Sequence, residues 1–377
     1  MTDTRRALRD LSPVIALALI WGAFALVSPE FLSPRNLSML VIELSTTALL
    51  ALGMLLVILP GHIDLSVGSG VGLIGGIASV LVFHHGWPAP LAMLLGFVVA
   101  VAVWTAMGAV VVKQKMPAFI ITLGGLLVFK GLFWLVIRNA TVPVAPGGTT
   151  NLYSMLTTYY LPPAAGLTLA LLCAGAFARL RWSAERRSAA DRGEPADGER
   201  VFLECFAAAQ GLLLFVLIMN RFRGVPLPVV ILAAATTGVV VLTRRTRFGR
   251  YLYAIGGNEE AAIMSGVPVE RVVIGAYAIM GAVVALTGYL QTAYSGASTT
   301  TVGDLMELDA VAACVIGGTS LKGGRGTAVG VLFGALIMAS LLNGMTLLAV
   351  SPEYKLIVRG LVLALAVWLD TRLARDS

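Results

Sequence analysis

Apolar stretches that are too long for the core of a soluble domain recur along the whole chain. Several of them run for about 18 residues or more without a charged side chain, which is long enough for an α-helix to cross a bilayer. Hydrophobic residues make up 58% of the chain and charged residues only 12%. Because each spanning helix satisfies its own backbone hydrogen bonds, lipid can accommodate many such segments in one unit. We therefore expect an all-α polytopic integral membrane protein, with residues 1–377 forming a single transmembrane domain.

Short polar stretches separate the apolar segments, and counting the segments predicts roughly ten to twelve transmembrane helices. The number depends on two breaks, 61–69 and 317–326, which are either surface loops or irregular backbone at membrane depth. We expect the first segment to be a retained span, because no small-x-small cleavage site of a secretory signal follows it. The predicted segments are residues 11–27, 37–59, 65–83, 90–112, 118–137, 161–178, 201–219, 227–242, 272–291, 308–316, 327–348 and 354–369.

Basic residues are concentrated in short loops next to apolar spans, which is the positive-inside pattern of membrane proteins. The net charge of +7 therefore gives no reason to expect a nucleic acid partner. Two strongly basic segments are predicted to face the cytoplasm, residues 179–200 as a mobile charged linker and residues 244–271 as a loop. Arginines near both ends of the chain place both termini in the cytoplasm as well. Arg221 and Arg223 run against the rule, since they fall on a predicted outer loop.

One short polar run within the second basic segment has the composition of a capped helix. An asparagine suits the N-cap, acidic residues in the first turn oppose the macrodipole, and two alanines favour helix. A glycine then ends the helix. On these grounds alone, the segment is either an ordinary amphipathic loop helix or a projection that fits into a groove of a partner protein. The residues concerned are Asn258, Glu259, Glu260, Ala261, Ala262, Ser265 and Gly266.

Residues that could support catalysis or bind a metal are sparse. The cysteines lie far apart, in or beside apolar segments, which indicates small buried thiols rather than disulfides or a metal site. The histidines form no cluster, and the sequence contains no Gly-x4-Gly-Lys-Ser/Thr phosphate-binding loop. We therefore expect no catalytic residue, no metal and no cofactor in this chain. The residues are Cys173, Cys205, Cys314, His62, His84 and His85.

The run around residue 258 resembles a known family. Residues 260–266, Glu-Ala-Ala-x3-Gly, look like the EAA loop of ABC importer permeases, and residues 253–266 resemble the ribose and xylose branch of that family. Four further segments resemble segments of xylose-type permeases in the same order. They are residues 63–69, 117–123, 223–229 and 308–321, and the resemblance as a whole covers about residues 36–370.

The resemblance implies a type II ABC importer-like permease embedded in the lipid bilayer of the bacterial inner (plasma) membrane. In this family two permease copies, here a homodimer, form the pathway for the substrate. Two separate ABC ATPase subunits bind and hydrolyse ATP below it, and a periplasmic or extracellular sugar-binding protein delivers the sugar from above. Residues 258–266 would then couple this chain to the ATPase. The long charged insert 179–200 resembles the xylose branch, so the expected substrate is a pentose, with D-xylose first.

This chain departs from the family at one position of the coupling run. Where the family often has Arg-Leu, the chain has Ile263 and Met264. We therefore expect apolar packing against the ATPase in place of one ionic contact.

Polar residues within apolar segments are costly in lipid and indicate a functional role. Glu43, Asp309 and Asn343 are expected to face the sugar pathway or the seam between two permease copies. Asp64 precedes a Gly-containing helix, so it either caps that helix or lines the pathway.

Two further residues are open to two interpretations. Phe119 and Thr122 would offer a sugar one apolar face and one hydroxyl group, or else they pack in the core. The rival hypothesis for the whole chain is an ion-coupled secondary sugar transporter, in which a buried acid such as Glu43 carries the coupling ion.

Overall fold

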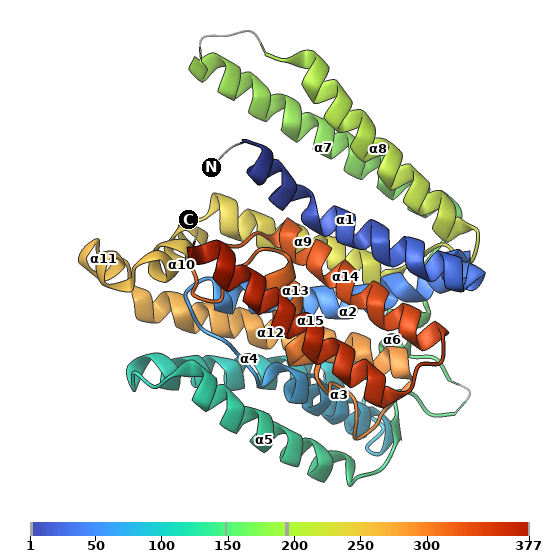
Figure 1. Cartoon of the computed structure of the whole chain (residues 1–377). Helices are drawn as coiled ribbons and strands as arrows, with labels where there is room; N and C mark the ends of the chain where they lie inside the picture. The colour runs from blue at the N-terminus through green and yellow to red at the C-terminus, as the bar shows by residue number, and fades with distance from the viewer. Residues whose placement is uncertain (1–2, 148, 193–195, 376–377) are drawn as a thin grey trace.

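The computed structural model describes residues 3–147, 149–192 and 196–375. Within these ranges the chain forms a bundle of long helices with two pairs of two-residue strands (Figure 1). Eight of the described helices are long and apolar enough to cross a bilayer, and each of the twelve predicted apolar segments coincides with a helix. The predicted all-α polytopic fold is therefore confirmed.

The elements follow one another along the chain in the order of their labels. The helices are α1 (Asp3–Val27), η1 (Pro29–Leu32), α2 (Pro34–Ile58), α3 (Val67–Phe83), α4 (Ala89–Lys113), α5 (Ala118–Ile137), α6 (Leu152–Thr158), α7 (Pro163–Arg192), α8 (Gly198–Asn220), α9 (Leu227–Arg245), α10 (Arg247–Gly257), α11 (Glu259–Met264), α12 (Val269–Ser295), α13 (Met306–Ile316), α14 (Ala328–Leu347) and α15 (Pro352–Arg375). The strands are β1 (Val142–Pro143), β2 (Tyr160–Leu161), β3 (Val225–Pro226) and β4 (Ala297–Ser298).

The core of the bundle is formed by α2, α3 and α12, which are buried among α4, α13 and α14. Glycines on α3 allow this close packing, because small residues let helix backbones approach one another. A Cβ atom at Gly75 of α3 would overlap the Thr292 hydroxyl of α12 and lie 2.9 Å from the Gly288 carbonyl oxygen. The contact between α3 and α12 therefore depends on the absence of a side chain at this position.

The helices α2–α5 and α12–α15 form two units with the same pattern of contacts. In the first unit α3 packs on α4 and α5, and in the second α13 packs on α14 and α15. Between the units, α2 packs on α13 and α14 just as α12 packs on α3 and α4. α2 and α12 run in opposite directions, since α2 ends where the Gly324 N–H donates to the Leu59 carbonyl oxygen, whereas α12 ends beside β4, which pairs with β1 after α5. The bundle thus contains an inverted repeat of the kind found in transporters.

The two breaks that the sequence leaves open differ from each other. The segment between α2 and α3 lacks helix, yet Asp64 and Ser66 are fully buried, so its backbone lies inside the bundle. The break between α13 and α14 is a Gly-rich turn, where Gly323 and Gly324 pack against Gly256 of α10. α3 and α13 are consequently short, with 17 and 11 residues.

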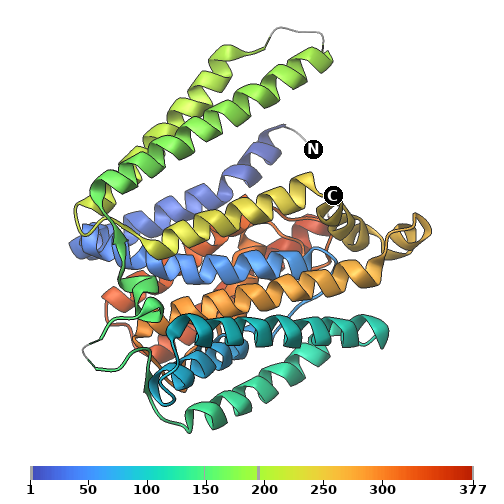
Figure 2. The same ribbon diagram turned by 180° about the vertical axis from the view of Figure 1, so that it is seen from behind.

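The charged segment 179–200 differs from the prediction of a mobile linker, because most of it is helical. α7 and α8 extend into it from both sides, and residues 193–195 lie outside the described ranges. Alanines favour helix here, and an ion pair between Arg181 of α7 and Glu204 of α8 joins the two arms. Figure 2 shows the resulting hairpin standing apart from the rest of the bundle.

Both ends of the chain lie at the end of the bundle that carries α10 and α11 (Figure 1). The basic residues of the segment 244–271 lie at this end too. The two termini therefore share one side with this basic segment, as the sequence predicts. The assignment of that side to the cytoplasm remains a prediction from charge.

The close approach of α3 and α12 predicts a large effect of a side chain at Gly75. Replacing Gly75 with Val forces backbone apart in a packed core, and we expect a loss of about 1–3 kcal/mol of stability. The measurement is the thermal unfolding midpoint of the purified protein in detergent. Gly175→Val on α7 is the matched control, because a Cβ atom there would meet nothing within 4 Å. Equal midpoints for the two variants would contradict this view of the core.

Candidate functional site

The helix predicted around residues 258–266 is present and projects from the end of the bundle as α11 (Figures 1 and 2). The Asn258 side chain accepts a hydrogen bond from the Ala261 N–H at 2.9 Å, which caps the helix as predicted. The Ser265 hydroxyl donates to the Ala261 carbonyl oxygen at 2.8 Å, and Gly266 ends the helix with φ of +79°. The local sequence therefore determines the start, the length and the end of α11.

The tip of α11 is apolar and open to its surroundings. Ala262 is buried against the bundle, whereas Ile263 is 55% exposed and Met264 is 90% exposed. Glu259 and Glu260 are exposed at the start of the same helix. A protruding methionine and isoleucine beside acidic residues are typical of a surface that another protein covers.

The helix α10 joins α11 firmly to the core. The Thr246 hydroxyl caps α10 by accepting from the Gly249 N–H at 3.1 Å, and the Tyr253 hydroxyl donates to the Gly326 carbonyl oxygen at 2.8 Å. At its other end, Gly256 fits so closely that a Cβ atom there would overlap the Leu59 carbonyl oxygen after α2. A displacement of α11 is therefore passed directly to the end of α2 and to the turn before α14.

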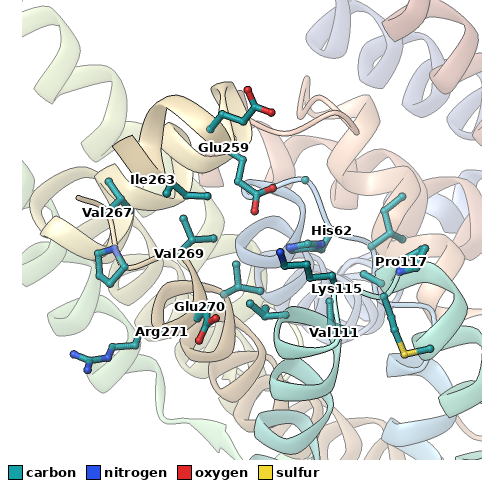
Figure 3. A pocket seen from close by; sticks show the side chains of 18 of the residues that line it. His62, Val111, Lys115, Pro117, Glu259, Ile263, Val267, Val269, Glu270 and Arg271 are labelled. Atoms are coloured by element: carbon teal, nitrogen blue, oxygen red, sulfur yellow. The ribbon is translucent and has the colours of Figure 1, made fainter. Parts of the chain in front are cut away.

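A pocket of about 1150 Å³ lies beside α11, between the end of α4, the start of α5 and the start of α12 (Figure 3). Its wall carries charges of both signs, including Glu259 and Lys115, and His62 lies beside them. Burial lowers the pKa of His62 below its ordinary value, and the nearby Glu259 carboxylate opposes that shift. The pocket separates α11 from α5 and leaves room for α11 to move toward the bundle.

The structure separates Phe119 and Thr122, which the sequence pairs as a sugar contact. Phe119 is largely exposed and lines the pocket beside α11. Thr122 is fully buried, and its hydroxyl donates to the Ile63 carbonyl oxygen at 3.2 Å. The two side chains therefore belong to different environments, and Thr122 fastens α5 to the irregular segment before α3.

Glu43 and Asn343 are brought together at the opposite end of the bundle from α11. The Tyr294 hydroxyl of α12 donates to Glu43 Oε1 at 2.9 Å, and Asn343 Nδ2 of α14 lies 3.4 Å from Glu43 Oε2. Asn36 Nδ2 in turn donates to Asn343 Oδ1 at 2.9 Å. This polar network joins α2, α12 and α14, and its members can donate to or accept from hydroxyl groups. Tyr294 and Asn36 were not identified from the sequence.

Asp64 is held in a closed set of hydrogen bonds. Its Oδ1 accepts from the Ser66 N–H at 2.9 Å and from the Ser66 hydroxyl at 2.6 Å, while Oδ2 accepts from Trp104 Nε1 at 2.7 Å. This is a local side-chain turn before α3, strengthened by a long-range donor from α4. Asp64 therefore stabilises the irregular segment, which agrees with the structural interpretation of this residue.

Asp309 lies apart from the Glu43 network, near the start of α13. Its Oδ2 forms an ion pair with Arg359 Nη2 of α15 at 3.1 Å. Among the described residues no group of three or more His, Cys, Asp or Glu side chains is arranged to hold a metal ion. The residues predicted for the sugar pathway thus fall into separate places, and only Glu43 and Asn343 form a common site.

Comparison with known proteins gives an extensive match. The family model described as "Branched-chain amino acid transport system / permease component" matches residues 36–367. The "Xylose transport system permease protein XylH" of Escherichia coli (strain K12) is 41% identical over 348 residues, which is 92% of this chain and 87% of that protein. The protein of the same name from Haemophilus influenzae is 39% identical over 360 residues, 95% of each chain.

The similarity extends to ribose permeases. The "Ribose import permease protein RbsC" of Bacillus subtilis (strain 168) is 33% identical over 365 residues, 97% of this chain and 94% of that protein. No solved structure matches the chain significantly. The matched region begins in α2 and ends in α15, so it contains both inverted units and α11. The chain therefore belongs to the permease components of ABC importers, a family of multi-pass inner-membrane proteins that are not enzymes.

Proposed function

We propose that the chain is the membrane-spanning subunit of an importer that carries a pentose, D-xylose first, and that a separate ATPase subunit drives. The observation that carries this proposal is α11, a capped helix with an exposed apolar tip that is fixed to the core through α10. The permease names of the relatives support the choice of a pentose. A second permease copy and an external sugar-binding protein complete the proposed assembly.

The proposed mechanism is alternating access. ATP-driven closure of the ATPase subunits pushes α11 toward the bundle, and the contact of Gly256 with the end of α2 transmits the displacement. At its far end α2 carries Glu43, which is hydrogen-bonded to α12 and α14. A shift of α2 along or across these helices changes the Glu43 network, so movement at one end of the bundle is felt at the other.

The Glu43 network offers a sugar weak and exchangeable hydrogen bonds. A carboxylate, two amides and a phenol can replace one another as partners of sugar hydroxyl groups. A permease that bound the sugar tightly would release it slowly, so this subunit needs little affinity of its own. Selectivity then resides mostly in the sugar-binding protein.

The exposed tip of α11 predicts the effect of a charge at Met264. Met264→Glu places a carboxylate where the ATPase packs, and we expect copurified ATPase and ATP-driven uptake to fall by about tenfold or more. Met155→Glu is the control for ATPase binding, since Met155 is also exposed but lies on α6, at the other end of the bundle. Full ATPase binding by the Met264 variant would refute the role of α11.

An ion-coupled transporter is the second candidate, and the part-buried Glu43 favours it. Proteoliposomes that contain the chain, its ATPase and its binding protein separate the two hypotheses. We expect pentose uptake that requires ATP and persists when a protonophore collapses the proton gradient. We also expect Glu43→Gln to lower uptake while leaving its ATP requirement in place. Concentrative uptake by the chain alone, driven by a proton gradient, would instead establish the second candidate.

A further inference from the structure

Five ionisable side chains gather on one side of the bundle, around the start of α13. The helices there lie in the order α5, α3, α13 and α15, since each packs on the next. We refer to this surface, from α5 to α15, as the α5–α15 face. Its ionisable residues are Lys130, Asp304, Glu307, Asp309 and Arg359.

Two of these residues clamp the backbone that leads into α13. Lys130 of α5 forms an ion pair with Asp304 and donates to the Thr300 carbonyl oxygen at 2.9 Å. On the other side, Arg359 of α15 pairs with Asp309 at 3.1 Å. The segment 300–309 is therefore held between one cation from each inverted unit.

Glu307 occupies the junction between the two short helices. It is only 7% exposed, and no other described side chain forms an ion pair or hydrogen bond with its carboxylate. Its Oε2 lies against Gly68 in the first turn of α3, where a Cβ atom would overlap it. The positive end of the α3 dipole therefore faces an acidic group that retains free hydrogen-bonding capacity.

These charges lie well inside the length of the helices. Lys130 is seven residues from the end of α5 and Arg359 is seven residues from the start of α15, which places each about 10 Å from the helix end. Even so, the side chains of Lys130 and Asp304 are 21% and 46% exposed. A charge at the centre of a lipid bilayer costs about 3 kcal/mol, so lipid is a poor neighbour for this face.

The hairpin of α7 and α8 shows what a lipid-facing surface of this chain looks like. Its arms are exposed along most of their length, and residues 163–178 and 205–220 contain no charged side chain. The α5–α15 face differs from it because it combines exposed leucines with an exposed ion pair. Two surfaces of one bundle are thus adapted to different surroundings.

We propose that the α5–α15 face meets the same face of a second copy of this chain, and that the sugar crosses the membrane along a water-filled seam between the two. The proposal rests on the proposed function and specifies where its pathway runs. A twofold axis brings identical surfaces together, so the surface must complement itself. This face does so, because it carries both cations and carboxylates beside exposed Leu127 of α5 and Leu356 of α15.

The seam gives the free groups of the face a use. Lys130 and Asp304 are exposed enough to exchange their partners for sugar hydroxyl groups, and Glu307 lies behind them at the junction of α3 and α13. Both short helices begin at this point, so a small movement of either inverted unit changes the width of the seam.

Cross-linking in membranes that contain the whole importer tests the position of the seam. Leu127→Cys and Leu356→Cys are expected to give permease dimers with a bifunctional thiol reagent, several-fold above the yield of Leu172→Cys on α7 and Leu214→Cys on α8. All four positions are exposed. The background is a chain whose native cysteines are replaced by alanine, namely Cys173, Cys205 and Cys314.

The outcomes separate the seam from the function itself. Dimers formed mainly through α7 and α8, or no dimers at α5 and α15 while ATP-driven uptake is intact, would overturn the seam and leave the importer standing. Loss of the ATP requirement in the cysteine-free background would count against the proposed function instead.

Charge exchange and solvent access test whether water and sugar reach this face. Lys130→Asp is expected to lower uptake by about tenfold or more, and adding Asp304→Lys should restore most of it, with ATPase copurification unchanged throughout. In the cysteine-free chain, Asp304→Cys should react with a membrane-impermeant thiol reagent, and Leu172→Cys should not. An unreactive Asp304→Cys, or full uptake by the Lys130 variant, would show that lipid or protein covers the face and that no pathway runs there.

Discussion

Irregular backbone is tolerated at membrane depth only where protein surrounds it, and this constraint organises the bundle. The segment between α2 and α3 has no helical hydrogen bonds of its own, so it is enclosed by α4 and α5. Asp64 accepts from Ser66 and from Trp104, and Thr122 donates to the same segment. Enclosing this segment brings α3 against α12, and the glycines of α3 make the contact close enough. The short helices, and with them the junction of the two inverted units, follow from this arrangement.

The local features of the chain could be predicted from its sequence, because short-range chemistry determines them. The apolar segments correspond to helices since their length and composition leave no alternative in lipid. Asn258, the two alanines and Gly266 define α11 through contacts within a few residues of one another. Glu43 and Asn343 were identified as a pair of interest because polar side chains are conspicuous in apolar spans, although their mutual contact was not predicted.

The partners that complete each site could not be predicted, because they come from distant parts of the chain. Trp104 lies 40 residues from Asp64, and Tyr294 lies 251 residues from Glu43. A tryptophan or tyrosine near a span end has many roles, and nothing in its neighbours indicates which one applies. The charged segment 179–200 was misjudged for a related reason: its composition resembles that of a flexible linker, but the ion pair between Arg181 and Glu204 forms only once α7 and α8 lie side by side.

The contact between Gly256, Leu59 and Gly324 consists of main chain alone. Side chains carry the chemical identity of a surface, whereas bare peptide groups transmit position and little else. A mechanical joint of this kind is indifferent to the cargo at the far end of the bundle. Relatives that transport other sugars can therefore keep the joint unchanged and diversify only the residues that meet the substrate, so that drive and selectivity evolve independently.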